Sequence, residues 1–348
     1  MISFFGSSGL YAHDPSGKLL WKRPMGPFIN DFGAASSPIL AGNRLILCQD
    51  HDLDSFLLCV NAETGDTLWK TDRSEFLRNS CTPILWNNEG RLQIVVAATL
   101  RVVGYDFETG VEAWTVRGIS RTVISSPSVG ADGHLYLACW AAGGDEAERI
   151  RVEPFDDVVL LKDIDKNGSL EEEELHEGPV YQRFSQADRN KDGHLTRSEY
   201  EFFRNLFDQG KNVLLSIGQG AAGDATETHV RWRHPKLVPF CASPLLYRGV
   251  LYTIKDGGIL QCINAQSGAA AKPLRLEASG SYYASPVAGD GKIILIDEQG
   301  RLTVVAAGED LQVLHTSDFK EDVYATPALV DGRLYIRTST RICCFGLR

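Results

Sequence analysis

The chain has 348 residues, of which 43% are hydrophobic and 23% are charged, and its formal net charge is −10. This is an ordinary globular composition, and the negative charge argues against electrostatic attraction to nucleic acid. No stretch approaches the ~18 consecutive apolar residues that a membrane-spanning helix needs, so the sequence predicts no membrane span.

The N-terminal segment MISFFGSSGLYAHD has no positively charged region followed by a long apolar core, so it is not a signal peptide. Its pattern is that of a strand repeat that begins part-way through. We therefore expect a natural N-terminal part outside this chain, which would carry any secretion signal. The expected location is periplasmic or secreted, although the given chain contains no signal peptide.

A short sequence unit recurs along the chain. A Ser-Pro or Thr-Pro pair followed by alternating apolar residues occurs six times, and a turn followed by Trp occurs at Trp21, Trp69 and Trp114. Repeats of ~40–45 residues that are marked by such Pro and Trp positions are more typical of β-propellers than of stacked solenoids. The pairs are Ser37-Pro38, Thr82-Pro83, Ser126-Pro127, Ser243-Pro244, Ser285-Pro286 and Thr326-Pro327.

Each unit predicts four short strands separated by Gly, Asn and Asp turns. In the second unit the strands are SSPILAG, RLILCQD, SFLLCVNA and DTLWKTD. A lone sheet of this size cannot bury both faces, whereas sheets packed side by side around an axis can. The repeated Trp is well suited to fill the space between neighbouring sheets.

The segments VNAETGDTLW and YDFETGVEAW resemble the repeat of quinoprotein-type, or PQQ-like, propellers, and AHDPSGKLLW matches it without the Thr. The later copies INAQSGAAAKPL and VAAGEDLQVL lack the Trp. The resemblance implies an all-β, PQQ-like β-propeller. Five complete and two partial units imply seven or eight blades in a ring that is N-terminally incomplete.

The eight cysteines contain no CxxC pair and no zinc-ligand spacing. Most of them lie in apolar, strand-like runs, so we expect small buried hydrophobic residues. A cross-strand disulfide between Cys48 and Cys59 is the alternative. The turn that contains Asp50, His51, Asp52 and Asp54 is expected to be a solvated loop.

One unit is interrupted. Trp232 follows Pro127 by 105 residues, where the other units have 31, so 74 residues are additional. They fall between HLYLAC (134–139) and VLLSIGQG (213–220), the second and third strands of that unit. The expected division is propeller over 1–140, a helical insertion over 151–211, and propeller again over 212–348.

The insertion contains two twelve-residue segments with the ligand pattern of EF-hand calcium loops, in which oxygen ligands occupy positions 1, 3, 5, 7, 9 and 12 and Gly occupies position 6. The flanking segments PFDDVVLLKDI and SEYEFFRNLF predict an entering and an exiting helix. The loops start only 25 residues apart, so the central helices must be short. The predicted Ca²⁺ ligands are Asp163, Asp165, Asn167, Ser169, Glu171 and Glu174 in the first loop, and Asp188, Asn190, Asp192, His194, Thr196 and Glu199 in the second; Ser169 and His194 would act through their carbonyls.

The two loops differ in charge. Residues 163–174 carry a net charge of −5, whereas residues 188–199 carry a net charge of 0. We therefore expect the first loop to bind Ca²⁺ more tightly.

The preferred function is a non-catalytic, calcium-binding propeller that acts as a scaffold for a protein or glycan partner outside the cytoplasm. A calcium sensor would need an exposed Met-rich or aromatic surface, but Met1 and Met25 both lie outside the insertion. Resemblance to quinoprotein dehydrogenases implies pyrroloquinoline quinone and an adjacent-cysteine disulfide. Cys343-Cys344 has that spacing, but it lies in a strand-like run that places the side chains on opposite faces. An outer-membrane assembly factor that shares the propeller is the remaining alternative.

Overall fold

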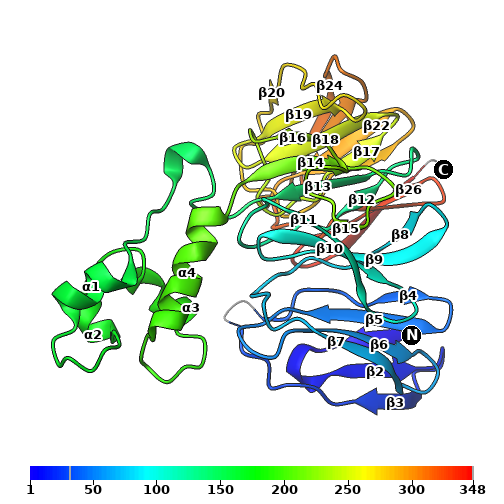
Figure 1. Ribbon diagram of the computed structural model, residues 1–348. Helices are drawn as coiled ribbons and strands as arrows, with labels where there is room; N and C mark the ends of the chain where they lie inside the picture. Colours follow the sequence, from blue (N-terminus) through cyan, green and yellow to red (C-terminus); the bar gives the residue numbers. More distant parts are fainter. Residues whose placement is uncertain (31–32, 347–348) are drawn as a thin grey trace.

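The computed structural model describes residues 1–30 and 33–346. In this part of the chain seven antiparallel sheets lie side by side around a common axis (Figure 1), and we number them as blades 1 to 7 in chain order. Five blades have four strands from their own unit, and blades 1 and 7 have three. The structure therefore confirms the all-β propeller.

The strand bounds follow the predicted units closely. Blade 1 consists of β1 (Ile2–Phe4), β2 (Leu10–His13) and β3 (Leu19–Arg23); blade 2 of β4 (Ile39–Ala41), β5 (Arg44–Gln49), β6 (Phe56–Asn61) and β7 (Thr67–Asp72); blade 3 of β8 (Ile84–Asn88), β9 (Arg91–Ala97), β10 (Arg101–Asp106) and β11 (Glu112–Arg117). Blade 4 consists of β12 (Ser128–Val129), β13 (Leu135–Cys139), β14 (Val213–Ile217) and β16 (Val230–His234); blade 5 of β17 (Leu245–Tyr247), β18 (Val250–Lys255), β19 (Ile259–Asn264) and β20 (Leu274–Arg275). Blade 6 consists of β21 (Val287–Gly289), β22 (Lys292–Ile296), β23 (Arg301–Ala306) and β24 (Val313–Asp318); blade 7 of β25 (Ala328–Val330), β26 (Arg333–Arg337) and β27 (Ile342–Gly346).

The middle strands of each blade form the core. β13 is buried throughout and β9 is buried from Gln93 onward, because both faces of a middle strand pack against a neighbouring blade. Their sequences, RLQIVVA and LYLAC, are correspondingly near-continuous apolar runs. The outermost strand β7 instead alternates between half-buried and exposed residues, as expected for a strand with one solvent-facing side.

The repeated Trp packs on the Gly turn of the following blade. A Cβ atom at Gly65 would lie 2.9 Å from the Trp21 ring, and one at Gly268 would lie 2.6 Å from the Trp232 ring. Gly65 has a φ of 77°, so only glycine meets both the backbone and the space requirement at this turn. The indole N–H of Trp21 donates to the carbonyl of Ala62 at 3.0 Å, which fixes the ring on the turn.

The Ser/Thr-Pro pairs join neighbouring blades through their hydroxyls. The Ser37 N–H donates to Thr82 Oγ1 at 3.0 Å, and the Ser126 N–H donates to Ser243 Oγ at 3.0 Å. Ser243 and Ser285 donate in the same way to Ser285 and Thr326. The repeat thus keeps a hydroxyl residue because its oxygen accepts a backbone hydrogen bond from the preceding blade.

Blade 3 departs from the pattern. The short strand β15 (Gly223–Asp224), from the turn of the next unit, pairs in parallel with β11 as a fifth strand. Trp114 does not reach a Gly turn here: it is buried, its Nε1–H donates to Gln93 Oε1 at 2.8 Å, and its ring meets that of Trp86 edge-on. This extra strand was not predicted from the sequence.

The turn at residues 50–52 corrects one prediction. Asp50, His51 and Asp52 are at most 3% exposed, so this part of the turn is not a solvated loop, whereas Asp54 is exposed as expected. Asp50 accepts two hydrogen bonds from the buried Arg73, and Asp52 is paired with Arg78. His51 stacks on Phe28 with ring centroids 4.2 Å apart.

All eight cysteines are free, and five of them are buried, so the expectation of small buried residues holds and the Cys48–Cys59 disulfide is not formed. Cys343 and Cys344 pair with Ile336 and Tyr335 on opposite faces of β27, and they too are free thiols. None of the described helices is long and apolar enough to cross a membrane.

Candidate metal-binding site

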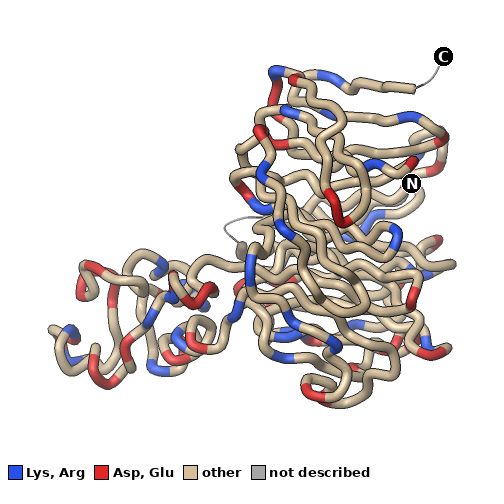
Figure 2. Tube along the Cα trace, turned by 90° about the horizontal axis from the view of Figure 1, so that it is seen from above, with Lys and Arg blue, Asp and Glu red and all other residues tan. Residues whose placement is uncertain are grey.

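A helical insertion connects β13 to β14 and projects from one side of the ring (Figure 1). This is the position predicted from the sequence, between the second and third strands of blade 4. Asp and Glu recur along the projection in Figure 2. The helical elements of the insertion are η2 (Glu146–Glu148), α1 (Phe155–Lys162), α2 (Glu172–Leu175), η3 (Tyr181–Arg183), α3 (Phe184–Ala187) and α4 (Arg197–Gln209). One further short helix, η1 (Gly6–Ser8), lies outside the insertion, in blade 1.

The insertion has its own apolar core. α4 buries Tyr200, Phe203, Leu206 and Phe207 along one side, and these side chains pack with Phe155 of α1 and with residues of α2 and α3. The two central helices have four residues each, as the short spacing between the loops predicts. The entering helix α1 is present as predicted, but Phe155 is its only buried residue, and Leu160 and Leu161 are more than 80% exposed.

The two predicted loops adopt the same backbone conformation. Lys166 and Lys191, at position 4, both have φ of 62°, and Gly168 and Gly193, at position 6, both have φ of 85°. A tight reversal with left-handed residues at these positions turns the oxygen-bearing side chains inward. The loops are joined back to back, because Leu170 and Leu195 exchange both main-chain hydrogen bonds, at 3.1 and 2.8 Å.

In the first loop, acidic side chains gather around one point. Oxygen atoms of Asp163, Asp165 and Glu174 all lie within 4.8 Å of one another, from positions 1, 3 and 12. The Asp163 carboxylate accepts hydrogen bonds from the N–H groups of Asn167 and Gly168. Glu174 is buried, and its carboxylate accepts from the N–H groups of Ile164 and Glu171. The loop backbone thus holds the carboxylates together despite their mutual repulsion.

The second loop repeats part of this arrangement. Asp188 is buried and accepts from the N–H groups of Lys191 and Gly193, at 2.7 and 3.0 Å. Glu199, at position 12, forms a capping box with Thr196 at the start of α4, as Glu174 does with Glu171 at the start of α2. Among the described residues, Asp188, Asp192 and Glu199 do not form a close cluster of the kind seen in the first loop.

The remaining predicted ligands lie in the same two turns. Asn167 and Ser169 bond to each other and, with Glu171, line the first loop, whereas Asn190 bonds to Asp192 in the second. His194 is predicted to act through its carbonyl, and its imidazole Nδ1 lies 2.5 Å from Glu171 Oε1 across the loop pair. No pattern in the sequence predicts this contact between the loops.

The donor set suits a hard divalent cation. The first loop offers carboxylate, amide and hydroxyl oxygens and no sulfur or ring nitrogen among its predicted ligands, which is the chemistry that Ca²⁺ prefers. Its three clustered carboxylates would hold the ion, and the turn around Gly168 leaves open space beside the Cα atom. The residues present therefore fit the group that the sequence pattern implies.

The second loop also contacts the ring. Arg189 donates to the carbonyl of Ser74 at 3.0 Å, and Lys191 Nζ lies 3.6 Å from Asp52 Oδ2. Arg78 pairs with Asp52 and donates to the Ser185 carbonyl of α3 at 3.2 Å. Leu77 of the ring packs in the core of the insertion. The contacts of Ser74 and Arg78 were not identified from the sequence, because they join residues that are 115 and 107 positions apart in the chain.

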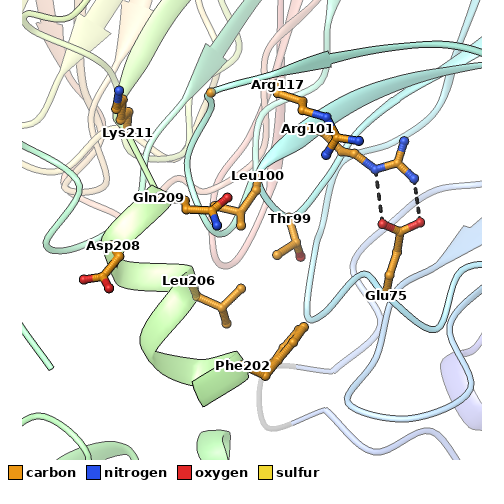
Figure 3. Close-up of a pocket in the computed structure, with 11 residues that line it drawn as sticks. Glu75, Thr99, Leu100, Arg101, Arg117, Phe202, Leu206, Asp208, Gln209 and Lys211 are labelled. Atoms are coloured by element: carbon orange, nitrogen blue, oxygen red, sulfur yellow. Dashed lines mark hydrogen bonds and ion pairs between the residues drawn. The ribbon is translucent and has the colours of Figure 1, made fainter. Parts of the chain in front are cut away.

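A pocket of about 450 Å³ follows the seam between α4 and the ring (Figure 3). Phe202 and Leu206 of α4 form one wall, and Glu75 and Arg101 lie on the other. The Arg101 guanidinium is held by Glu75 at 2.5 Å and by Glu112 at 2.7 Å, so little of its charge remains for a ligand.

This architecture defines a PQQ-like β-propeller. Residues 6–143 match the family profile described as outer membrane protein assembly factor BamB. BamB from Moraxella catarrhalis has a similar solved structure, with a TM-score of 0.63 and 12% identity over 99% of this chain and 80% of that chain. At this identity the likeness establishes the fold alone.

A second similar structure is the quinohemoprotein alcohol dehydrogenase ADHIIG from Pseudomonas putida HK5. The TM-score is 0.56 and the identity 11%, over 99% of this chain and 63% of that chain, so this chain spans less than two thirds of that enzyme. The same fold thus occurs in an assembly factor and in a dehydrogenase. No curated protein is significantly similar to the chain.

Proposed function

We propose that this protein is a non-catalytic propeller that binds a protein partner outside the cytoplasm, and that its insertion is an EF-hand pair that holds Ca²⁺. The observation that carries the calcium assignment is the convergence of Asp163, Asp165 and Glu174 within 4.8 Å, in a loop whose backbone angles are repeated in the second loop.

Calcium has a structural role in this proposal. Asp163, Asp165 and Glu174 would hold the ion in the first loop, with Asn167, Ser169 and Glu171 completing the oxygen shell. In the second loop these roles fall to Asp188, Asn190, Asp192, His194 (through its carbonyl), Thr196 and Glu199. The positive charge offsets the repulsion among carboxylates, so binding is coupled to the stability of the insertion. Extracellular calcium modules have dissociation constants of about 10⁻⁴–10⁻³ M, which would keep the sites filled in such surroundings.

The match of residues 6–143 to the BamB profile supports the extracytoplasmic, partner-binding part of the proposal. A BamB-like role in outer-membrane assembly is the specific version of that function. A quinoprotein-type dehydrogenase is less well supported, since the adjacent cysteines that the resemblance singles out are free thiols on opposite faces of β27.

Isothermal titration calorimetry with Ca²⁺ tests the metal site. We expect saturable heat for the wild-type chain and none for the double variant Asp163→Ala, Asp188→Ala. The matched control is Asp157→Ala, which removes an exposed acid of α1 outside both loops and should leave binding unchanged. Absence of heat at millimolar Ca²⁺, together with melting curves that are identical with and without chelator, would reject the assignment.

The non-catalytic part is tested separately. The chain is mixed with pyrroloquinoline quinone and Ca²⁺, and oxidation of alcohols is followed with an artificial electron-accepting dye. We expect no turnover above the rate without protein. Saturable, protein-dependent alcohol oxidation would establish an enzyme in place of the scaffold.

A further inference from the structure

Arg121 lies in the loop 118–127 between blades 3 and 4, where the end of the insertion meets the propeller. The Lys211 N–H donates to the Ile119 carbonyl at 3.1 Å, so the segment after α4 is joined to this loop through the main chain. The Arg121 guanidinium lies over the aromatic ring of Phe207 in α4, with its central carbon 4.5 Å from the ring centroid. The side chain is therefore held at the junction of the insertion and the propeller.

The charge of Arg121 has no acidic partner. Although the residue is half-buried, its guanidinium forms neither an ion pair nor a hydrogen bond within residues 1–30 and 33–346. Nε is sealed from solvent and unpaired, whereas Nη1 and Nη2 are not sealed, so a small ion can reach the two terminal nitrogens. Charged side chains that are removed from water are normally paired. The partner that this group lacks is an anion.

A second guanidinium without an acidic partner lies at the same aromatic ring. The central carbon of Arg183, in η3, is 5.8 Å from the Phe207 centroid. Within the described residues Arg183 donates only to the Pro179 carbonyl at 3.5 Å and to Gln182 Oε1 at 3.4 Å. Both contacts are long for hydrogen bonds. Two positive charges without carboxylate partners thus meet at one phenyl ring.

A third positive charge lies near Arg121. Burial and the charges of Arg183 and Arg78 lower the pKa of Arg121 to about 10, and no carboxylate opposes these effects. Arg78 is itself paired with Asp52, so it adds to the local potential but has its counter-ion. An arginine keeps its proton at neutral pH, so the repulsion is relieved by an anion and not by loss of the charge.

The contact with Phe207 does not replace an anionic partner. A cation–π contact contributes about 0.5–2 kcal/mol, and it uses none of the N–H donors of the guanidinium. The planar fork of N–H groups matches the paired oxygens of a phosphate or sulfate group. Two unpaired guanidinium groups balance the charge of a divalent oxyanion, whereas one carboxylate would balance only one of them.

We propose that Arg121 and Arg183 form a binding site for a divalent tetrahedral oxyanion, a phosphate or sulfate group, at the junction of the insertion and the propeller. Nη1 and Nη2 of Arg121 donate to the oxyanion from the propeller, and the Arg183 guanidinium donates to it from the insertion. Because the two donors come from different parts of the chain, the bound ion fastens the insertion to the propeller. The site goes beyond the proposed function, and it depends neither on Ca²⁺ binding nor on a protein partner.

Isothermal titration calorimetry of the full chain with sodium sulfate, at constant ionic strength, tests the site. Sulfate is the probe because it stays dissolved with about 1 mM Ca²⁺, which keeps the calcium loops supplied. We expect saturable heat, and Arg121→Met and Arg183→Met should each bind at least about tenfold more weakly, equivalent to 1.4 kcal/mol. The matched control is Arg248→Met, which removes an exposed guanidinium that lies 5.1 Å from the Tyr247 centroid; it should bind within about twofold of wild type.

Thermal unfolding separates a binding role of Arg121 from a structural one. Arg121→Met keeps the apolar contact with Phe207 and removes an unpaired charge, so without oxyanion it should melt at or above the wild-type temperature. Added sulfate should raise the melting temperature of the wild type more than that of Arg121→Met, because only the wild type gains binding free energy. A marked fall in the melting temperature of Arg121→Met without oxyanion would overturn the proposal, by showing that the charge is already balanced within the protein.

The calorimetry has equally clear adverse outcomes. No saturable heat up to about 10 mM sulfate, or equal binding by wild type and the two Met variants, would overturn the site. Acetate that binds as tightly as sulfate would overturn the assignment to a divalent oxyanion.

Glycerol 3-phosphate distinguishes two sources of the group. Binding as tight as that of sulfate, and lost in Arg121→Met, would support the site and identify a phosphate ester as its ligand. Binding of sulfate without binding of the ester would support the site and identify a free ion.

Discussion

The buried ion pair between Asp50 and Arg73 allows a quantitative test of the structure. Both residues are at most 2% exposed, and Arg73 Nε and Nη2 donate to the two Asp50 oxygens at 2.8 and 2.7 Å. Burial acts to lower the pKa of Arg73, but the Asp50 carboxylate raises it and the net shift is upward, so the guanidinium stays charged. The change to test is Asp50→Ala.

Removing one partner leaves a buried charge without compensation, which costs about 3–5 kcal/mol, whereas an exposed pair is worth about 0–1 kcal/mol. Arg73 also lies over the Phe76 ring at 4.0 Å, so it cannot swing to solvent without losing that packing. We therefore expect Asp50→Ala to lower the free energy of unfolding by about 3–5 kcal/mol. The double variant Asp50→Ala, Arg73→Met should recover most of the loss, because it removes the charge as well.

Equilibrium urea unfolding, followed by tryptophan fluorescence, measures the effect. The control is Arg117→Ala, which removes an exposed partner located 3.5 Å from Asp224 and should shift the midpoint only slightly. An Asp50→Ala midpoint as close to wild type as that of Arg117→Ala would show that the pair is not buried as described, and the reasoning would fail.

Further tests address the blades, the turn and the loops. Gly65→Ala should destabilise the protein by more than 1 kcal/mol and red-shift the fluorescence of Trp21, because the new Cβ meets the indole ring and φ is positive; an unshifted spectrum would contradict that packing. Burial lowers the pKa of His51, and the nearby Asp50 and Asp52 offset this shift only in part. The His51 ring therefore takes up a proton more readily in the unfolded chain than in the folded protein. Stability should therefore fall as the pH drops below about 6.5, and His51→Phe should reduce the difference in melting temperature between pH 7.5 and 5.5. Leu170→Ala should lower the free energy of unfolding of the insertion by about 2–5 kcal/mol. The expected readout is faster amide hydrogen exchange in α4, while the amides of the propeller strands remain as protected from exchange as in the wild type. Asp163→Ala should weaken Ca²⁺ binding more than Asp188→Ala in calorimetry, because the first loop alone gathers three carboxylates.

The parts of the structure that the sequence predicted are those specified locally. Strand bounds follow from alternating apolar residues and turn residues within one unit, and the loop pair follows from twelve consecutive residues. The burial of Asp50 and Asp52 could not be predicted in this way, because their partners Arg73 and Arg78 are 23 and 26 residues away and face them only in the folded ring. A cluster of acids in a turn is normally solvated, and tertiary pairing reversed that expectation here.

The same distinction applies to the insertion. The spacing of the loops predicted short central helices, but the contact of His194 with Glu171 and the exposure of Leu160 and Leu161 depend on how the two halves pack. The fifth strand β15 was missed for a related reason, since two residues carry too little pattern to indicate a strand.

The hydroxyl link between Ser126 and Ser243 has a consequence for engineering. This hydrogen bond connects blade 4 to blade 5 between residues that are 117 positions apart in the chain. Within blade 4, Cys139 and Val213, which flank the helical insertion, are directly paired on the neighbouring strands β13 and β14. A two-residue Asn-Gly connection could therefore replace residues 140–212 as an ordinary hairpin. The position where this protein carries its helical arm is thus a natural grafting point, at which other modules could be exchanged while the toroid keeps its register.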